Sequence, residues 1–115
     1  MATSLNPLPP AKRERNRYLV YSVASDAPLK GEEMGKVIWK TALEFLGELG
    51  VARSCLRIVD FDEKKQKGVI KVSHKSVEEA RVVLALVKEA NKKPVALHVT
   101  GVSGILKKAK GKYLS

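Results

Sequence analysis

The chain has 115 residues, of which 22 are basic and 12 are acidic, and its formal net charge is +10. A chain of this length is expected to form one domain and to bury a sizeable hydrophobic core. The single Cys55 excludes an intrachain disulfide, no run is long and apolar enough to span a bilayer, and the first residues lack an apolar signal segment, so we expect a cytoplasmic protein without a membrane segment.

A basic arm precedes the first predicted strand. Residues 1–16 combine three prolines with the charged run AKRERN, and this composition opposes both helix and strand. From Arg17 the segment RYLVYSVA is rich in β-branched and aromatic residues, which predicts a strand. We therefore expect a flexible arm over residues 1–16 and a folded domain over residues 17–102.

A helix and a hairpin follow. Residues 32–49 repeat apolar side chains with the helical period, Phe45 and Leu49 closing the stripe, and Gly50 stands where a helix stop is expected. Residues 51–61, VARSCLRIVDF, alternate with period two and predict a second strand. A polar connection leads into GVIKVSH, the returning third strand. The acidic residues Asp60, Asp62 and Glu63 stand next to lysines at this connection, which indicates a solubilising turn and not a metal site.

The last third of the chain predicts a second helix, a fourth strand and a C-terminal helix. Ser76 followed by Glu79 is a capping-box pattern that starts the second helix, whose apolar stripe runs to Ala90. PVALHVTG alternates again and predicts the fourth strand. After it, residues 103–115 predict a short basic helix and tail capped by Ser103.

The order βαββαβ predicts an α+β sandwich of the ferredoxin-like or RNA-recognition-motif-like kind. It has a four-stranded antiparallel sheet with both helices on one face, and here the extra C-terminal basic helix. The strand residues predicted to face the helices are Leu19, Tyr21, Val23, Leu56, Ile58, Ile70, Val72, Val95, Leu97 and Val99. Those predicted on the open face are Tyr18, Val20, Ser22, Arg53, Arg57, Val59, Lys71, Ser73, His98 and Thr100.

The third strand can be compared with that of the RNA-recognition motif, which carries aromatic rings that stack bases. In KGVIKVSH the ring positions hold Val69, Lys71 and His74, which leaves Tyr18 and His98 as stacking candidates. Stacking supplies about 1 to 3 kcal/mol per base, so recognition of unpaired bases is poorly supported. Phosphate contacts need only Arg, Lys and backbone amides. The sequence favours recognition of the backbone and shape of a folded RNA.

The positive charge is concentrated at the two ends of the chain. Residues 1–25 carry four basic residues and one acidic residue, residues 26–89 carry twelve and eleven, and residues 90–115 carry six and none. Binding to a polyanion requires such a concentration, whereas solubility alone would spread both signs. Basic tails are also common on soluble proteins. A ferredoxin-like module that binds a small ligand or another protein, without an RNA function, is therefore the alternative.

Three blocks of the chain resemble a known family. They are RYLVYSV, the run LGELGVARSCLRIVDFDEKKQKGVIKVSHKSVEEARVVLALV, and HVTGVSGILKKAK. Together they cover residues 17–110, and they resemble the archaeal ribonuclease P protein component 2 family. The resemblance implies a noncatalytic subunit of the ribonucleoprotein that removes the 5′ leader from precursor tRNA, in which the RNA performs the hydrolysis.

The resemblance also implies partners. Component 2 acts with the ribonuclease P RNA and with component 3, a TIM-barrel-like protein, and family members pair with themselves. We expect no cofactor, no bound metal and no catalytic residue in this chain. A folded catalytic RNA repels itself, so a basic protein bound across its helices lowers the cation concentration that the active shape requires.

The candidate RNA-binding residues fall mainly on two segments. Arg53 and Arg57 share a face of the predicted second strand, near Lys71 on the third. This face is either a patch that binds RNA phosphates, a solvated sheet surface, or a surface that pairs with acidic residues of a partner protein. Ser103 lies in the GVSG turn, where helix-start amides would bind phosphate; the alternative is a flexible turn before a frayed tail. The full set is Arg17, Arg53, Arg57, Lys71, Ser103, Lys107, Lys108 and Lys110.

The first predicted helix is apolar over too wide an arc for one sheet to cover. Trp39, Leu43 and Leu46 form a second stripe beside the core-facing one. This second stripe would be covered by the terminal helix, by a second copy of the chain, by component 3 or by simple internal packing. Trp is enriched at interface hot spots. Val82 and Leu86 lie off the stripe of the second helix in the same way. We predict a protein interface at these five residues.

Overall fold

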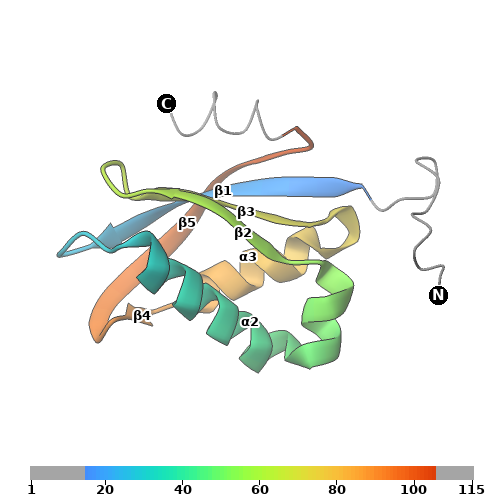
Figure 1. Cartoon of the computed structure of the whole chain (residues 1–115), viewed down its shortest axis with the longest axis horizontal. Coiled ribbons are helices and arrows are strands. Elements are labelled where there is room, and N and C mark those ends of the chain that lie inside the picture. The colour runs from blue at the N-terminus through green and yellow to red at the C-terminus, as the bar shows by residue number, and fades with distance from the viewer. Residues whose placement is uncertain (1–14, 106–115) are drawn as a thin grey trace.

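The computed structural model describes residues 15–105 and shows a curled antiparallel sheet with two helices on one face (Figure 1). The elements are β1 (Asn16–Ser25), α2 (Gly31–Ser54), β2 (Arg57–Asp62), β3 (Lys67–Ser73), the 3₁₀ turn η2 (His74–Ser76), α3 (Val77–Leu86), β4 (Glu89–Ala90) and β5 (Lys93–Ser103). Most of the predicted arm, and residues 106–115 of the predicted C-terminal helix, lie outside the described residues. Between residues 15 and 105 neither helix is long and apolar enough to cross a membrane.

The sheet has five strands in the order β2-β3-β1-β5-β4, and every neighbouring pair is antiparallel. The prediction of four strands was wrong because it missed β4, which has only two residues. The helical stripe was extended to Ala90, whereas α3 ends at Leu86. Asn91 and Lys92 join β4 to β5 with positive φ angles of 52° and 64°, the backbone that a tight two-residue hairpin requires.

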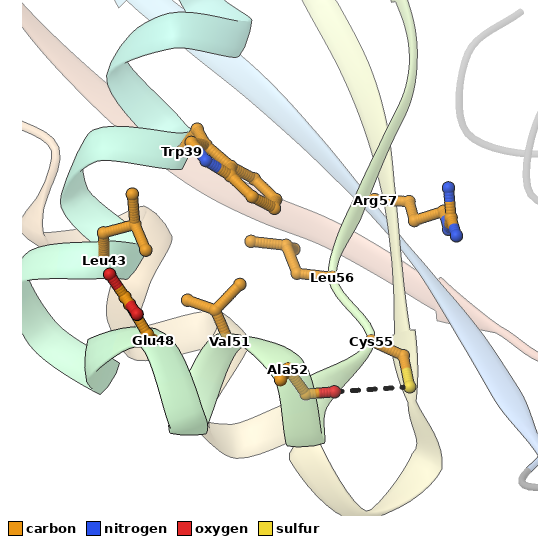
Figure 2. A pocket seen from close by; sticks show the side chains of 8 residues that line it. All are labelled: Trp39, Leu43, Glu48, Val51, Ala52, Cys55, Leu56 and Arg57. Atoms are coloured by element: carbon orange, nitrogen blue, oxygen red, sulfur yellow. Dashed lines mark hydrogen bonds between the residues drawn. The ribbon is translucent and has the colours of Figure 1, made fainter.

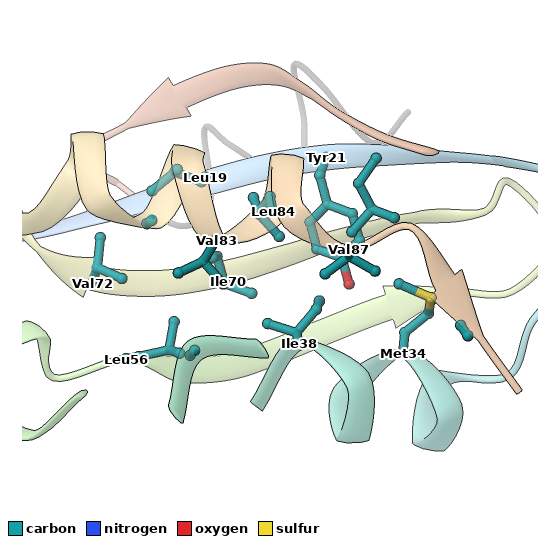
Figure 3. Close-up of a cluster of buried hydrophobic side chains, with 14 of the residues drawn as sticks. Leu19, Tyr21, Met34, Ile38, Leu56, Ile70, Val72, Val83, Leu84 and Val87 are labelled. Atoms are coloured by element: carbon teal, nitrogen blue, oxygen red, sulfur yellow. The ribbon is translucent and has the colours of Figure 1, made fainter. Parts of the chain in front are cut away.

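The core lies between the sheet and the two helices (Figure 3). Period-two alternation in β1 and β3 supplies Leu19, Tyr21, Ile70 and Val72, as predicted. The helices contribute the buried residues Met34, Ile38, Ala42, Val51, Ala80, Val83 and Leu84. Of the ten strand residues predicted in the core, Ile58 is 37% exposed, because β2 is an edge strand. Val23 and Val99 are half-buried and pack against the cluster.

Helix α2 is longer than predicted and contains a break. Gly47 has φ 74° and ψ 172°, a conformation outside the helical region that glycine adopts without strain. Helical conformation then resumes as far as Ser54. The strand predicted from residue 51 was therefore wrong over its first half: Val51 and Ser54 are buried with helical spacing, and the Ser54 hydroxyl donates to the Val51 carbonyl at 2.8 Å. Cys55, with φ 54°, ends the helix in place of Gly50.

The β2–β3 connection is fastened to the start of α2. The Gly31 N–H donates to Glu63 Oε2 at 2.9 Å, which places a negative charge at the positive end of the helix dipole. The Leu29 N–H donates to Gln66 Oε1 at 2.9 Å, and Gln66 Nε2 donates back to the Leu29 carbonyl at 3.0 Å. This connection is therefore a structural clamp as well as a polar turn. Within residues 15–105 no three His, Cys, Asp or Glu side chains form a group that could hold a metal ion.

The start of α3 was predicted correctly, but its capping was not. Ser76 directly precedes the helix, and its side chain makes no capping hydrogen bond. The Ser73 hydroxyl instead accepts from the Lys75 N–H at 3.3 Å and opens η2. The predicted capping box was therefore wrong, and Glu79 lies exposed on the first turn of α3.

Gly68 is required by Tyr21, its partner across β1 and β3. A Cβ atom at position 68 would lie 2.5 Å from Tyr21 Cζ, closer than packed atoms approach. The Tyr21 ring also stacks on Phe61, with ring centroids 6.3 Å apart. The Lys-Gly opening of this strand, which also begins the RNA-recognition pattern, serves packing in this protein.

Removing the Tyr21 hydroxyl should stabilise the protein. This hydroxyl is buried without a hydrogen-bond partner among residues 15–105, and burial raises the pKa of the side chain above its ordinary value. We expect Tyr21→Phe to raise the free energy of unfolding at pH 7 by about 1 kcal/mol. Above pH 10 the unfolded chain releases a proton that folded Tyr21 keeps. The wild type should then lose a further ~1.4 kcal/mol per pH unit relative to the variant.

Urea unfolding between neutral and alkaline pH measures both effects. Tyr18→Phe, at a half-buried position of the same strand, is the control and should change stability by less than about 0.5 kcal/mol. A loss of stability in Tyr21→Phe, or parallel pH profiles for the two proteins, would contradict the expectation.

Candidate nucleic-acid interface

The open sheet face carries a line of polar side chains across four strands. In the antiparallel register Arg57 of β2 lies opposite Lys71 of β3, Lys71 opposite Tyr18 of β1, and Tyr18 opposite Ser103 of β5. Directly opposed residues point to the same face, with Cβ atoms about 4.5 to 5.5 Å apart. Leu19, next to Tyr18, is in the core, so the line faces away from the helices. We call Arg57, Lys71, Tyr18 and Ser103 the polar row.

Arg57 and Lys71 are like charges placed directly opposite each other, an arrangement that destabilises a sheet. Neither has an ion-pair partner among residues 15–105. Arg57 is exposed, and Figure 2 shows it leaving β2 on the side away from Leu56 and Trp39. Lys71 is half-buried. An anion bound between the two cations would relieve their repulsion, so this pair marks a candidate phosphate site.

The rest of the open face is less basic. Val20 and Val69 lie on this face and are fully buried, with Tyr18 and Val59 packed against them, so the face is covered at this point and not open to solvent. Further along the strands, Lys67 lies opposite Asp62, so the charges of this pair offset each other. The basic end of the face is therefore the end that holds the polar row.

Arg17 lies at the same end of the sheet but outside the polar row. It is opposite Val72, on the helix-facing side of β1. Its Nη1 donates to the Asn16 carbonyl at 3.0 Å, and a Cβ at position 104 would lie 3.4 Å from this atom. The guanidinium thus stands beside Gly104, in the backbone that leaves β5.

Ser103 is the last residue of β5. Its hydroxyl donates to the Ile105 carbonyl and accepts from the Ile105 N–H, both at 3.1 Å. The bond from the Ile105 N–H is of the type that a capping serine accepts, but the predicted helix itself lies outside the described residues, so the cap stays a prediction. Ser103 also belongs to the polar row. Lys107, Lys108 and Lys110 lie outside the described residues.

Arg53 does not share a face with Arg57, and that prediction was wrong. Arg53 is in the last turn of α2, because the helix continues past Gly50. A cation in the last helical turn complements the helix dipole, which accounts for Arg53 without RNA.

Helix α2 presents an apolar surface beside the edge strand β2. Trp39, Leu43 and Ile58 are 41%, 36% and 37% exposed, and they line a groove of about 520 Å³. A second groove of about 630 Å³ shares Trp39 and Leu43 and reaches Leu56 beyond the helix break (Figure 2). Sequence reasoning missed Ile58 because alternation assigned it to the core. We call Trp39, Leu43 and Ile58 the Trp39 surface.

The other predicted interface residues lie elsewhere. Leu46 is half-buried and packs against the core. Val82 and Leu86 are 41% and 44% exposed on α3, and Val82 lines a separate groove with Phe45. Phe45 was predicted in the core stripe and is 48% exposed. Leu49, also predicted in the core stripe, is 72% exposed, so the helical layer exposes apolar side chains in several places.

The helical layer has the opposite charge balance to the chain as a whole. Helices α2 and α3 contain six acidic and four basic residues, in a chain of net charge +10. The acidic residues are Glu32, Glu33, Glu44, Glu48, Glu78 and Glu79. Because negative charge repels a polyanion, this layer suits a protein partner better than RNA.

The fold is that of a basic protein with an antiparallel sheet and two helices, and comparison with known proteins supplies its family. The Rpp14/Pop5 family matches residues 17–114. Ribonuclease P protein component 2 of Thermococcus kodakarensis is 41% identical over 108 residues, which are 94% of this chain and 90% of that protein. The protein of the same name from Pyrococcus horikoshii is 36% identical over 115 residues, 100% of this chain and 96% of that protein. The chain belongs to the Rpp14/Pop5 family.

A solved structure shares the fold. A chain in the cryo-EM structure of yeast ribonuclease MRP matches with a TM-score of 0.63, covering 81% of this chain and 76% of that chain. The two sequences are only 10% identical, so this likeness shows the fold alone.

The repulsion across the polar row can be measured in the free protein. Lys71→Glu and Arg57→Glu each convert the like-charge pair into an opposite-charge pair. Each should raise the free energy of unfolding by about 0.5 to 1 kcal/mol at low salt, and the gain should shrink as salt screens the charges. Urea unfolding at two salt concentrations is the measurement.

The double variant Arg57→Glu/Lys71→Glu is the matched control, because it restores repulsion with the sign reversed. Its stability should fall short of the sum of the two single effects. Additive effects would mean that the two side chains do not interact.

Proposed function

We propose that this chain is a noncatalytic protein subunit of ribonuclease P, which binds the catalytic RNA and stabilises it for removal of the 5′ leader from precursor tRNA. The observation that carries the proposal is the polar row, where Arg57 and Lys71 oppose each other without an ion-pair partner among residues 15–105. Membership of the Rpp14/Pop5 family and the names of its relatives support the assignment. The chain acts as an accessory to an RNA catalyst.

The polar row would act through the RNA backbone. The Arg57 guanidinium can give two parallel hydrogen bonds to one phosphate, and the Lys71 ammonium adds a point charge beside it. The half-buried Tyr18 ring leaves room for at most one stacked base at this end of the face. Such contacts position the protein without reading sequence, so selectivity would come from the shape of the folded RNA.

Fixed cations explain how such a subunit would raise activity without touching the scissile bond. Packed RNA helices repel one another, and Mg²⁺ at high concentration relieves the repulsion. A protein that neutralises phosphates releases counterions and makes affinity fall steeply with salt, at a slope of about 0.9 per phosphate on duplex DNA. The protein would therefore matter most when magnesium is limiting.

The alternative function is that of a ferredoxin-like module without an RNA role. Strand order alone does not decide between the two functions, because the order β2-β3-β1-β5 is that of a split βαβ sandwich in either case. We assign the chain to that class, with β4 as an addition at the edge. A cytoplasmic location follows as an expectation from its single cysteine.

We further propose that the Trp39 surface binds a protein subunit of the particle, component 3 in the family that the sequence resembles. An exposed Trp among apolar neighbours is the usual centre of such an interface, and the groove beside it is lined by an apolar centre with Lys36, Lys40 and Glu44 around it. Self-association of the chain is a further expectation from the same resemblance.

Reconstitution with cognate RNA and component 3 at limiting magnesium tests the subunit role. Omitting this protein should sharply reduce precursor cleavage. Arg57→Ala/Lys71→Ala should lower cleavage toward the omission level, and the slope of log affinity against log salt should fall by about 1.4 to 1.8 if both cations contact phosphate.

Lys92→Ala/Lys93→Ala is the control, since it removes the same charge from exposed positions at the β4–β5 turn. It should keep most of the cleavage and the binding slope. Equal losses in the two double variants would mean that net charge, and not the polar row, binds the RNA. Cleavage that is unchanged by omission would refute the subunit role.

Trp39→Ala tests the protein interface. We expect its affinity for component 3 to fall by about 30-fold, the effect of a hot spot near 2 kcal/mol. Titration calorimetry with purified component 3 measures it. Leu86→Ala removes a similarly exposed apolar side chain from α3 and serves as the comparison. A larger loss in Leu86→Ala than in Trp39→Ala would place the interface elsewhere.

A further inference from the structure

A groove between α2 and α3 is apolar at its base and acidic at its rim. It holds about 350 Å³ and is lined by Phe45 and Leu46 from α2 and by Glu78, Glu79 and Val82 from α3. Phe45 and Val82 are 48% and 41% exposed. We call it the α2–α3 groove. It lies in the helical layer, away from the polar row and separate from the Trp39 surface.

The rim carries two carboxylates, Glu78 and Glu79, and the exposed cations Lys75 and Arg81 lie within four residues of them in the sequence. Glu78 pairs with Arg81 at 3.7 Å, and the Glu78 side chain is 87% exposed, so this ion pair is largely solvated. Glu79 has no ion-pair partner among residues 15–105. The groove therefore fits a segment that combines apolar side chains with cations.

The described chain begins next to this rim. The Arg15 carbonyl accepts from the His74 N–H at 2.7 Å and lies 3.2 Å from His74 Nδ1. His74 is the first residue of η2, which leads directly into α3. Arg15 is therefore bonded to a residue that stands only four positions before Glu78 in the sequence.

The sequence before Arg15 has the matching chemistry. Residues 5–13 read LNPLPPAKR, in which Leu8 and three prolines precede Lys12 and Arg13. Proline fixes an extended backbone before binding, and such segments bind grooves lined by aromatic rings, here Phe45, at low entropic cost. At about 3.3 Å per residue, Leu8 can lie up to ~23 Å from Arg15. This exceeds the roughly 14 Å that the chain rises over the nine residues from His74 to Val82, through the 3₁₀ turn η2 and the first turns of α3.

We propose that residues 5–13 dock in the α2–α3 groove of their own chain, with Leu8 and the prolines against Phe45 and Val82, and with Lys12 and Arg13 facing Glu78 and Glu79. The basic arm is then directed to the acidic helical layer and is not an RNA contact. The docked segment also covers Phe45 and Val82, which stay exposed when the two helices pack on the sheet.

Paramagnetic relaxation in the free full-length protein tests the proposal. Cys55→Ser removes the native thiol, and Leu8→Cys receives a nitroxide. The amide signals of Phe45 and Val82 should lose most of their intensity, whereas that of Ala96, exposed on β5, should keep it. A nitroxide on Ala11→Cys should give the same pattern, which guards against a label at Leu8 that itself blocks docking.

Charge reversal provides the matched comparison. Glu78→Lys/Glu79→Lys should restore most of the lost intensity, whereas Glu44→Lys/Glu48→Lys makes the same charge change at residues that line the other grooves and should not. Equal recovery in both variants would mean a diffuse attraction and would overturn the docked arrangement.

Two other results would also overturn it. Broadening in a mixture of nitroxide-labelled chains with separate isotope-labelled chains would place the arm on a second copy. Full intensity at Phe45 and Val82, with arm signals that change only when ribonuclease P RNA is added, would make the arm an RNA contact. None of these measurements involves the polar row, so failure here leaves the proposed function to its own test.

Discussion

The pairing of β1 with β3 fixes the positions of both the core and the candidate RNA site. Side chains alternate along a strand, so the register that sets Leu19 opposite Ile70 and Tyr21 over Gly68 must also set Tyr18 beside Lys71 on the open face. A slip by one residue would turn Lys71 into the core and expose Ile70. Core packing, with the Tyr21 ring over Gly68, therefore holds Lys71 opposite Arg57 against their mutual repulsion.

The two sides of the molecule differ in charge, and this difference organises the proposed contacts. The open sheet face is basic at the polar row, whereas α2 and α3 carry more acids than bases. A polyanion would approach the sheet, and protein segments would approach the helices. The Trp39 surface and the α2–α3 groove are formed mainly by the helices, so a protein subunit and the arm could be bound while the polar row stays open to RNA.

Much of the sheet could be predicted because alternation is a local property. The faces of β1 and β3, and the closeness of Arg57 to Lys71, follow from period two and a hairpin. Arg53 was assigned to a strand, whereas α2 continues to Ser54 and buries Val51 and Ser54 in the core. That burial depends on tertiary packing, which a local sequence pattern does not contain. Ile58 was misplaced because exposure depends on which strand ends at the sheet edge. The Glu63 and Gln66 clamp joins segments more than thirty residues apart, and β4 is too short to leave a periodic signal. The predicted roles of Lys107, Lys108 and Lys110 stay predictions.

RNA should bind at the end of the sheet that holds the polar row, while a protein subunit should bind at the helices. Site-specific photocrosslinking in the reconstituted particle distinguishes the two surfaces. A photoreactive label is attached to a single cysteine at Ser103→Cys, in the polar row, or at Lys40→Cys, beside Trp39, each on a Cys55→Ser background. We expect RNA adducts from position 103 and protein adducts from position 40. RNA adducts from position 40, with none from position 103, would refute this arrangement.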